Sequence, residues 1–167
     1  MMAGLLLILL AQTPPLPPPS TTLAKPVKAK LHRGAPPQQS QIDAAREKAK
    51  ARGLGLAGIH VPLDAKALAK GSWFKLPDGR PAWMLQVESS GAQALRLQFR
   101  AFQVGKGKVW VHAAGEAGGP YTGQGPNGDG EFWSETIHGA IVTLEFVPEG
   151  ARPAKLPFRV ETISHQL

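Results

Sequence analysis

The amino-acid sequence predicts an all-β fold, an antiparallel β-sandwich or jelly roll, preceded by a proline-rich segment and one short helix. From Gly71 onward, apolar and polar residues alternate with a period of two, as in strands that bury one face. Turn residues separate these segments at a spacing of roughly ten residues, and no helical segment lies between them. The composition agrees, because 19 glycines, 16 prolines and only 19% charged residues favour a turn-rich β protein.

The chain begins with an apolar run, AGLLLILLA, over residues 3–11. This run is too short for a membrane-spanning helix, which needs about 20 residues, so no stable membrane span is expected. It fits the core of a signal peptide with Ala11 as the last residue before cleavage, although no Lys or Arg precedes the run. We therefore expect residues 1–11 to be a signal peptide and the protein to be secreted or periplasmic.

Residues 12–40 contain eight prolines and read as an extended or disordered basic linker. The net charge of +7 lies wholly in the first part of the chain. Residues 12–70 carry ten Lys and Arg against three Asp and Glu, whereas residues 71–167 carry nine of each sign. Because the compact part is neutral, a basic face for nucleic acid is not expected there.

Residues 41–70 are predicted to form a short helix and a connector. Gln41–Arg52 is rich in helix-forming residues, Ser40 can cap the helix and Gly53 can end it. The apolar side of this helix is nearly all alanine, so we expect it to be only loosely docked. Residues 54–62 read as an irregular apolar connector.

Residues 71–167 are predicted to form the sandwich itself. The first two strands flank Pro77–Arg80, whose turn chemistry predicts a hairpin. Ala140–Val147 is nearly apolar on both faces and is therefore expected to be a central strand. The predicted strands are Trp73–Leu76, Ala82–Glu88, Ala94–Gln103, Lys108–Ala113, Glu131–Trp133, Ala140–Val147 and Pro157–His165.

A glycine-rich stretch, Gly118–Glu135, separates two of these strands and is predicted to be an elaborated loop. Six of its first thirteen residues are glycine, which permits tight turns, and aromatic residues flank it. Such loops more often carry binding than chemistry. Aromatic residues beside the loop supply either a contact platform or core anchors. The candidate binding residues are Trp110, Tyr121, Asn127, Asp129 and Trp133.

The sequence offers no catalytic set. It contains no cysteine, which excludes disulfides, thiolate metal sites and thiol nucleophiles. No serine lies in a nucleophile motif, and the proximity of Ser134 to His138 is better explained by a turn before a strand. A small hydrolase using Asp129, Glu131 or His138 is a remaining alternative.

Calcium is the one ligand ion that the sequence suggests. Asn127, Asp129 and Glu131 alternate around glycines, as oxygen ligands do in calcium loops. The stretch has too few carboxylates and no acid at the closing position of such a loop. The alternative interpretation is that these are turn residues that bond their own backbone. No metal site and no other cofactor is therefore assigned.

Three segments carry a resemblance to a known family: WMLQVESSGAQALRLQFRAFQVGKGKVWVHAAG, then GPYTGQGPNGDGEFWSETIHGAIVTLEF, then PFRVETISHQ. Together they cover about half of the chain. This part of the sequence resembles the N-terminal non-catalytic β domain of bacterial secreted trypsin-like serine proteases, the lysyl-endopeptidase-like group. The matching features are Ser90–Ala92 before an alternating strand, Lys108–His112, the GPY and FW elements within Gly119–Trp133, and the closing strand toward His165.

In that family the domain precedes a catalytic domain that holds the His, Asp and Ser. The resemblance implies that the protease would begin where this sequence ends, at Leu167, and no catalytic residue is carried over. It therefore implies an accessory module that binds a protein or peptide, with a serine protease as one such partner. The alternative is a carbohydrate-binding module that uses Trp110, Tyr121 or Trp133.

Overall fold

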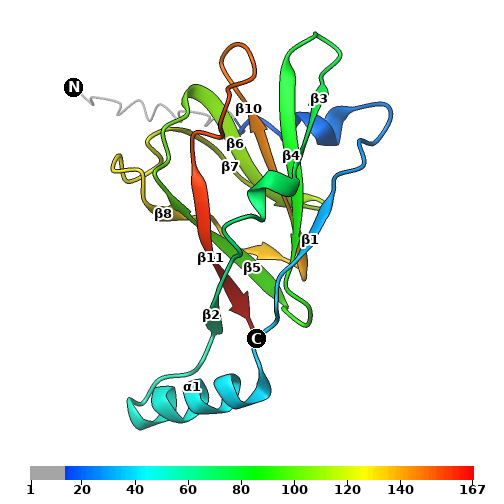
Figure 1. The fold of residues 1–167 in the computed structure, drawn as a ribbon. Coiled ribbons are helices and arrows are strands. Elements are labelled where there is room, and N and C mark those ends of the chain that lie inside the picture. Colours follow the sequence, from blue (N-terminus) through cyan, green and yellow to red (C-terminus); the bar gives the residue numbers. More distant parts are fainter. Residues whose placement is uncertain (1–13) are drawn as a thin grey trace, which may run out of the picture.

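A computed structural model describes residues 14–167, which form two β-sheets packed face to face and one helix that lies apart from them (Figure 1). The predicted all-β sandwich is thus confirmed. The predicted signal peptide, residues 1–11, lies outside the described residues.

The first sheet has six strands, in the order β1-β4-β10-β6-β7, and β3 also pairs with β4. All of its pairs are antiparallel except β1 with β4. The β3–β4 pair is the hairpin predicted around Pro77–Arg80. The bounds are β1 Leu31–Arg33, β3 Ser72–Lys75, β4 Pro81–Glu88, β6 Gly105–Ala113, β7 Glu116–Gly123 and β10 Ile141–Val147.

The second sheet has five strands, in the order β2-β11-β5-β8, and β9 also pairs with β5. All of its pairs are antiparallel, and β11 lies between β2 and β5. The bounds are β2 Gly58–Pro62, β5 Ala94–Arg100, β8 Phe132–Trp133, β9 Ile137–His138 and β11 Arg159–Gln166.

The core between the sheets centres on aromatic rings. Phe99 of β5 is completely buried, and its ring stacks on Phe132 at 4.9 Å between centroids. The rings of Phe102, Tyr121 and Phe158 pack around Phe99 at 5.4–5.9 Å. Because these residues come from β5, β7, β8 and the connections between strands, the cluster ties the two sheets together.

The outer face of the six-stranded sheet is also partly covered. A second apolar cluster, made of Leu76, Ala82, Trp110 and Val147, lies there with Leu23 packed against it. The cover comes from residues 14–23, which we call the strap, and which include the 3-10 helix η1 (Pro19–Thr22).

Of the extended or disordered linker expected over residues 12–40, the disordered alternative is corrected for the described part, residues 14–40. The strap bonds to the sheet, and β1 adds a parallel strand to β4. Proline lacks an N–H for a sheet ladder, but an extended proline-rich segment can lie on side chains instead. Hydrogen-bond donors and acceptors on the sheet surface therefore hold the strap in place, although its composition alone suggests that it is disordered.

Helix α1 (Gln39–Ala51) confirms the helix predicted over Gln41–Arg52. It begins two residues earlier than predicted, because Gln38 rather than Ser40 is the N-cap residue. The side chain of Gln41 accepts a hydrogen bond from the Gln38 N–H at 2.8 Å.

The predicted end of the helix at Gly53 is correct. Gly53 has φ 69°, a left-handed conformation that glycine adopts without a steric penalty. Its N–H donates to the Lys50 carbonyl at 2.9 Å, and the Leu54 N–H donates to the Ala49 carbonyl at 2.9 Å, which completes a Schellman motif. The helix itself buries no residue, in agreement with the expectation that it is loosely docked.

Besides the short β1 and β9, two strands of five or more residues occur where the sequence predicted irregular structure. The connector over residues 54–62 contains β2, and the first part of the loop predicted at Gly118–Glu135 belongs to β7. Both strands lie at an end of their sheet, where one side of the backbone needs no partner strand. Proline and glycine are tolerated in such edge strands, and Pro120 lies in β7.

Candidate functional site

The structure separates the three aromatic residues that were predicted to bind a ligand. Trp110 is only 2% exposed, because the strap covers it, and its indole Nε1 donates to the Leu16 carbonyl at 2.9 Å. Tyr121 is 7% exposed and belongs to the core, where its hydroxyl accepts from the Glu135 N–H at 3.0 Å. Trp133 alone is partly exposed. A shared platform of these three rings does not form.

The polar candidates lie at the exposed tip of the glycine-rich loop. The Asn127 amide donates to the Glu131 carbonyl at 2.8 Å, and Asp129 Oδ1 accepts from the Glu131 N–H at 2.9 Å. The Glu131 carboxylate pairs with Arg100. These contacts match the turn interpretation of the loop. Within residues 14–167, no three His, Asp or Glu side chains gather in a way that could hold a metal ion.

Trp133 lies on the outer face of the five-stranded sheet with two neighbours that the sequence did not identify. The His60 ring of β2 lies 4.7 Å from the Trp133 ring, at 33° to it. The Arg96 guanidinium of β5 lies 5.8 Å from the Trp133 ring centroid, and its Nε donates to the Ser134 carbonyl at 2.9 Å. We call these three residues the Trp133 surface.

A hollow of about 460 Å³ adjoins the Trp133 surface. It is lined by Trp133 and Arg96 together with Pro120, Pro126 and Glu135 from β7, the glycine-rich loop and the turn after β8. The predicted loop and one predicted aromatic residue therefore do come together. Arg96 could have been found from its outward position in an alternating strand, whereas His60 lies in a strand that was not predicted.

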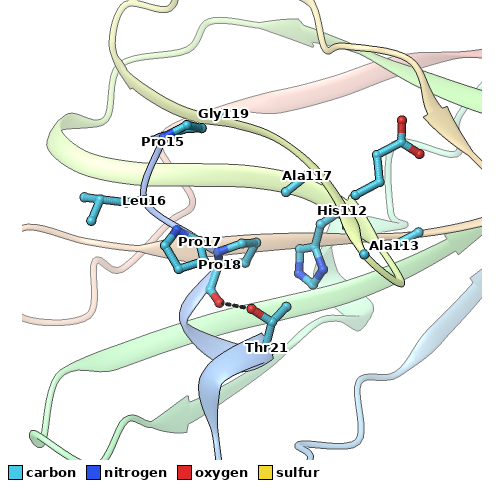
Figure 2. A pocket seen from close by; sticks show the side chains of 11 residues that line it. Pro15, Leu16, Pro17, Pro18, Thr21, His112, Ala113, Ala117 and Gly119 are labelled. Atoms are coloured by element: carbon cyan, nitrogen blue, oxygen red, sulfur yellow. Dashed lines mark hydrogen bonds between the residues drawn. The ribbon is translucent and has the colours of Figure 1, made fainter. Parts of the chain in front are cut away.

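A second pocket, of about 330 Å³, lies between the strap and the hairpin of β6 and β7 (Figure 2). Figure 2 shows His112 of β6 pointing toward Pro18 and Thr21 of the strap. The Thr21 hydroxyl donates to the Pro18 carbonyl at 2.7 Å and so holds the strap in a turn. The pocket is thus formed by segments about 90 residues apart in the chain.

Glu145 is the buried polar centre of this region. Its side chain is completely buried on β10, and its Oε2 lies 3.0 Å from His112 Nε2. The strap supplies two further partners, because the Ser20 N–H donates to Oε1 at 2.9 Å and the Ser20 hydroxyl donates to Oε2. A buried carboxylate needs such partners to offset the loss of water. Sequence reasoning missed this cluster, and the one signal was a glutamate inside a nearly apolar strand.

The order of these groups does not suit nucleophilic catalysis. In a Ser-His-acid triad the histidine lies between the serine and the acid and takes the serine proton. Here Glu145 lies between Ser20 and His112 and contacts both. The arrangement can fix the strap to the sheet, but it places no histidine on the Ser20 hydroxyl.

A second serine–histidine pair is also enclosed. Ser89 Oγ lies 2.8 Å from His165 Nδ1, and the two residues are 0% and 2% exposed. Burial lowers the pKa of His165, which keeps the imidazole neutral. Because no substrate can reach this serine, the contact is structural.

The residues proposed for a small hydrolase are not brought together. His138 of β9 pairs with the first residue of β5, whereas Glu131 contacts Arg100 at the other end of that strand. The His138 N–H donates to Glu116 Oε2 at 2.8 Å, and this bond is the main reason why the pKa of Glu116 is lowered. His138 and Glu131 therefore lie at opposite ends of a seven-residue strand.

Comparison with known proteins gives one match. The model of a family described as the lysyl endopeptidase N-terminal domain matches residues 16–167, which include most of the strap, the helix and both sheets. Neither the curated proteins nor the solved structures contain a match. Within the described part of the chain, no helix is both long enough and apolar enough to cross a membrane.

Proposed function

Because the chain belongs to the lysyl endopeptidase N-terminal domain family, we propose that it is a non-catalytic accessory module of an exported proteolytic system, with a polypeptide as its partner. The non-catalytic role is supported by the state of the serine–histidine contacts in residues 14–167. Ser89 and His165 are enclosed, and Ser20 faces Glu145 rather than a histidine. The proposed partner is a trypsin-like protease.

The Trp133 surface supports a partner-binding role. Trp and Arg are the residues most enriched where protein interfaces derive their affinity. Here Arg96 and His60 both lie close to the Trp133 ring, so the ring has less side-chain freedom to lose on binding. The adjoining hollow gives a partner side chain a place to enter. The proposed contact face is therefore the outer face of the five-stranded sheet at β8.

The carbohydrate-binding alternative receives less support. A sugar platform needs several exposed aromatic rings, but Trp110 and Tyr121 are buried. Trp133 is left as the one predicted ring that a glycan could reach, with a histidine and an arginine beside it.

A binding measurement tests the proposal. The probe is purified lysyl endopeptidase catalytic domain with its nucleophilic serine replaced by alanine, and the readout is isothermal titration calorimetry. We expect saturable binding that Trp133→Ala weakens about tenfold or more, as for an interface hot spot. The control is Ile141→Ala, an exposed residue of the other sheet. Absence of binding, or equal affinity of Trp133→Ala and the wild type, would contradict the proposal.

A separate assay tests the non-catalytic role. The purified protein is incubated with lysyl peptide esters and with soluble glycans, and no turnover is expected. Turnover that disappears in either the Ser20→Ala or the Ser89→Ala variant would show that one of these serines acts as a nucleophile, and the proposed role would then be wrong.

A further inference from the structure

The outer face of the six-stranded sheet carries a groove that we propose to be a binding site for a proline-rich peptide that is extended up to its central proline and then turns, as the strap does. In this structure the strap, residues 14–23, occupies the groove as a ligand from the same chain. This site lies on the opposite sheet from the Trp133 surface, so it does not depend on the function proposed above.

The groove is built from outward-facing positions that a solvated sheet would fill with polar residues. Val109 and Val111 of β6 and Leu144 of β10 point into the core, so the alternating positions between them point outward. Those outward positions carry Trp110, His112, Glu145 and Val147, and all four are buried. The strap bonds to Trp110 and Glu145, and His112 lines the pocket beside it. The sheet thus presents an indole, an imidazole and a carboxylate to one proline-rich segment.

The groove recognises the main chain of the strap at two points. The Trp110 indole N–H donates to the Leu16 carbonyl at 2.9 Å, and Glu145 Oε1 accepts from the Ser20 N–H at 2.9 Å. The groove thus bonds two strap residues that are four positions apart, one through a donor and the other through an acceptor. These two contacts fix both the register and the direction of the bound segment. Such contacts serve any peptide whose backbone is extended at the first position and turns at the second, as the strap does in its 3-10 helix.

Proline at the centre of the strap matches this mode of recognition. Pro18 lies between the two main-chain contacts, is buried, and has φ −57° and ψ 129°, close to a polyproline II helix. Aromatic-lined grooves commonly bind proline-rich segments because the polyproline II conformation is already formed before binding. An indole N–H beside a buried proline provides the same chemistry here.

The Ser20 side chain adds sequence selectivity. Its hydroxyl donates to Glu145 Oε2, which His112 Nε2 also contacts at 3.0 Å. A ligand with a hydrophobic residue in place of this serine would leave the carboxylate with one partner fewer in a buried setting. The preferred ligand is therefore a run of prolines followed by a residue with a hydroxyl group.

The fit of the strap is looser than that of a core element. The pocket of about 330 Å³ remains between the strap and the β6–β7 hairpin, and Leu16 is 59% exposed. The space beside the strap is open to solvent. Contacts of this kind allow the strap to leave the groove and be replaced by a second peptide.

Competition in the full chain tests the site. The labelled probe is a peptide with the sequence of residues 14–23, PPLPPPSTTL, and its binding is followed by fluorescence anisotropy. Ser20→Ala weakens the strap but leaves the groove unchanged, so this variant should bind the peptide about fivefold more tightly than the wild type, the ratio expected from one hydrogen bond. Thr22→Ala is the matched control, because that hydroxyl contacts only Pro19 within the strap, and it should bind as the wild type does.

Two further measurements separate specific from non-specific binding. In the Ser20→Ala background, Trp110→Phe removes the indole donor but keeps a ring, and it should weaken peptide binding about fivefold or more while the thermal transition persists. A peptide with alanine in place of its serine should bind about fivefold more weakly. Unchanged peptide affinity in the Trp110→Phe variant would show that the peptide binds elsewhere and would overturn the proposal.

Hydrogen exchange of residues 14–23 reports whether the strap has been released. If Ser20→Ala does not raise that exchange, the double variant Pro18→Gly with Ser20→Ala takes its place. The proposal is overturned if a variant with a released strap binds no peptide at concentrations up to about 1 mM, where even weak specific binding is detected.

Discussion

At the scale of single residues, Phe99 has the largest expected effect on stability. Its ring is completely buried and contacts four other aromatic rings at 4.9–5.9 Å. Phe99→Ala should lower the free energy of unfolding by about 3–5 kcal/mol, because it removes buried area and leaves a cavity between the sheets. Urea denaturation measures this loss. A loss below about 1 kcal/mol would show that the cluster collapses around the gap.

Ser89 and His165 provide a prediction about pH. Burial lowers the pKa of His165 below the ordinary 6.5, so the unfolded chain binds a proton on this group at a higher pH than the folded chain does. The free energy of unfolding should therefore fall as the pH is lowered through 6.5, until the folded-state pKa is reached. At a pH well above 6.5, the full contribution of the neutral His165 to the free energy of unfolding is present.

The measurement is urea denaturation of wild type and His165→Asn between about pH 7.5 and pH 5. Asparagine keeps a polar group near Ser89 but does not titrate, so the wild type should lose more stability across this range. Burial and Lys70 also lower the pKa of His32, but that group is common to both proteins and cancels in the difference. Parallel pH curves for the two proteins would contradict the assignment.

At the scale of elements, α1 should be the least stable part of the described chain. Its thirteen residues bury no side chain, and an isolated helix of this length is marginal in water. Its amides should therefore exchange with deuterium much faster than those of β4, β6 and β10. Exchange followed by mass spectrometry tests this expectation, and protection of residues 39–51 equal to that of β10 would contradict it.

The elements also show how far the sequence predicts the fold. Strands with clean alternation, such as Ala94–Arg100, were predicted because every second side chain enters the core. The strands β2 and β7 were missed because they contain glycine and proline and show little alternation. The strand conformation of β2 is imposed by pairing with β11, which is far away in the sequence. That of β7 is imposed by pairing with β6 across a turn.

The candidate sites were predicted less well, again because the structure depends on partners that are distant in the sequence. Trp133 was identified from its place beside the glycine-rich loop, but its neighbour His60 is about 70 residues away in the chain. The contact between Ser20 and Glu145 spans 125 residues, and neither residue lies in a recognisable motif. Contacts of this range depend on the assembled sheet, so local patterns do not reveal them.

At the scale of the whole molecule, the strap closes the outer surface of the sandwich. Replacing residues 14–23 by a Gly-Ser segment of equal length removes its three hydrogen bonds to Trp110 and Glu145. The free energy of unfolding should fall by about 1–3 kcal/mol. The uncovered cluster of Leu76, Ala82, Trp110 and Val147 should also favour self-association.

Two readouts test this expectation: acrylamide quenching of tryptophan fluorescence, which should rise as Trp110 is uncovered, and the mass in solution by light scattering. The control replaces Ala35 and Pro36, two exposed residues before the N-cap of α1, by Gly and Ser. If stability and quenching in the strap replacement equal those of the control, the strap does not protect the sheet in solution.

The central position of β11 has a consequence for biosynthesis. Arg159–Gln166 is the last strand of the sequence, yet it lies between β2 and β5. Until these residues emerge from the ribosome, β2 and β5 have no common neighbour, and the five-stranded sheet cannot assemble. Synthesis of Arg159–Gln166 is therefore the step that joins β2 to the rest of this sheet, and assembly of the five-stranded sheet waits for it.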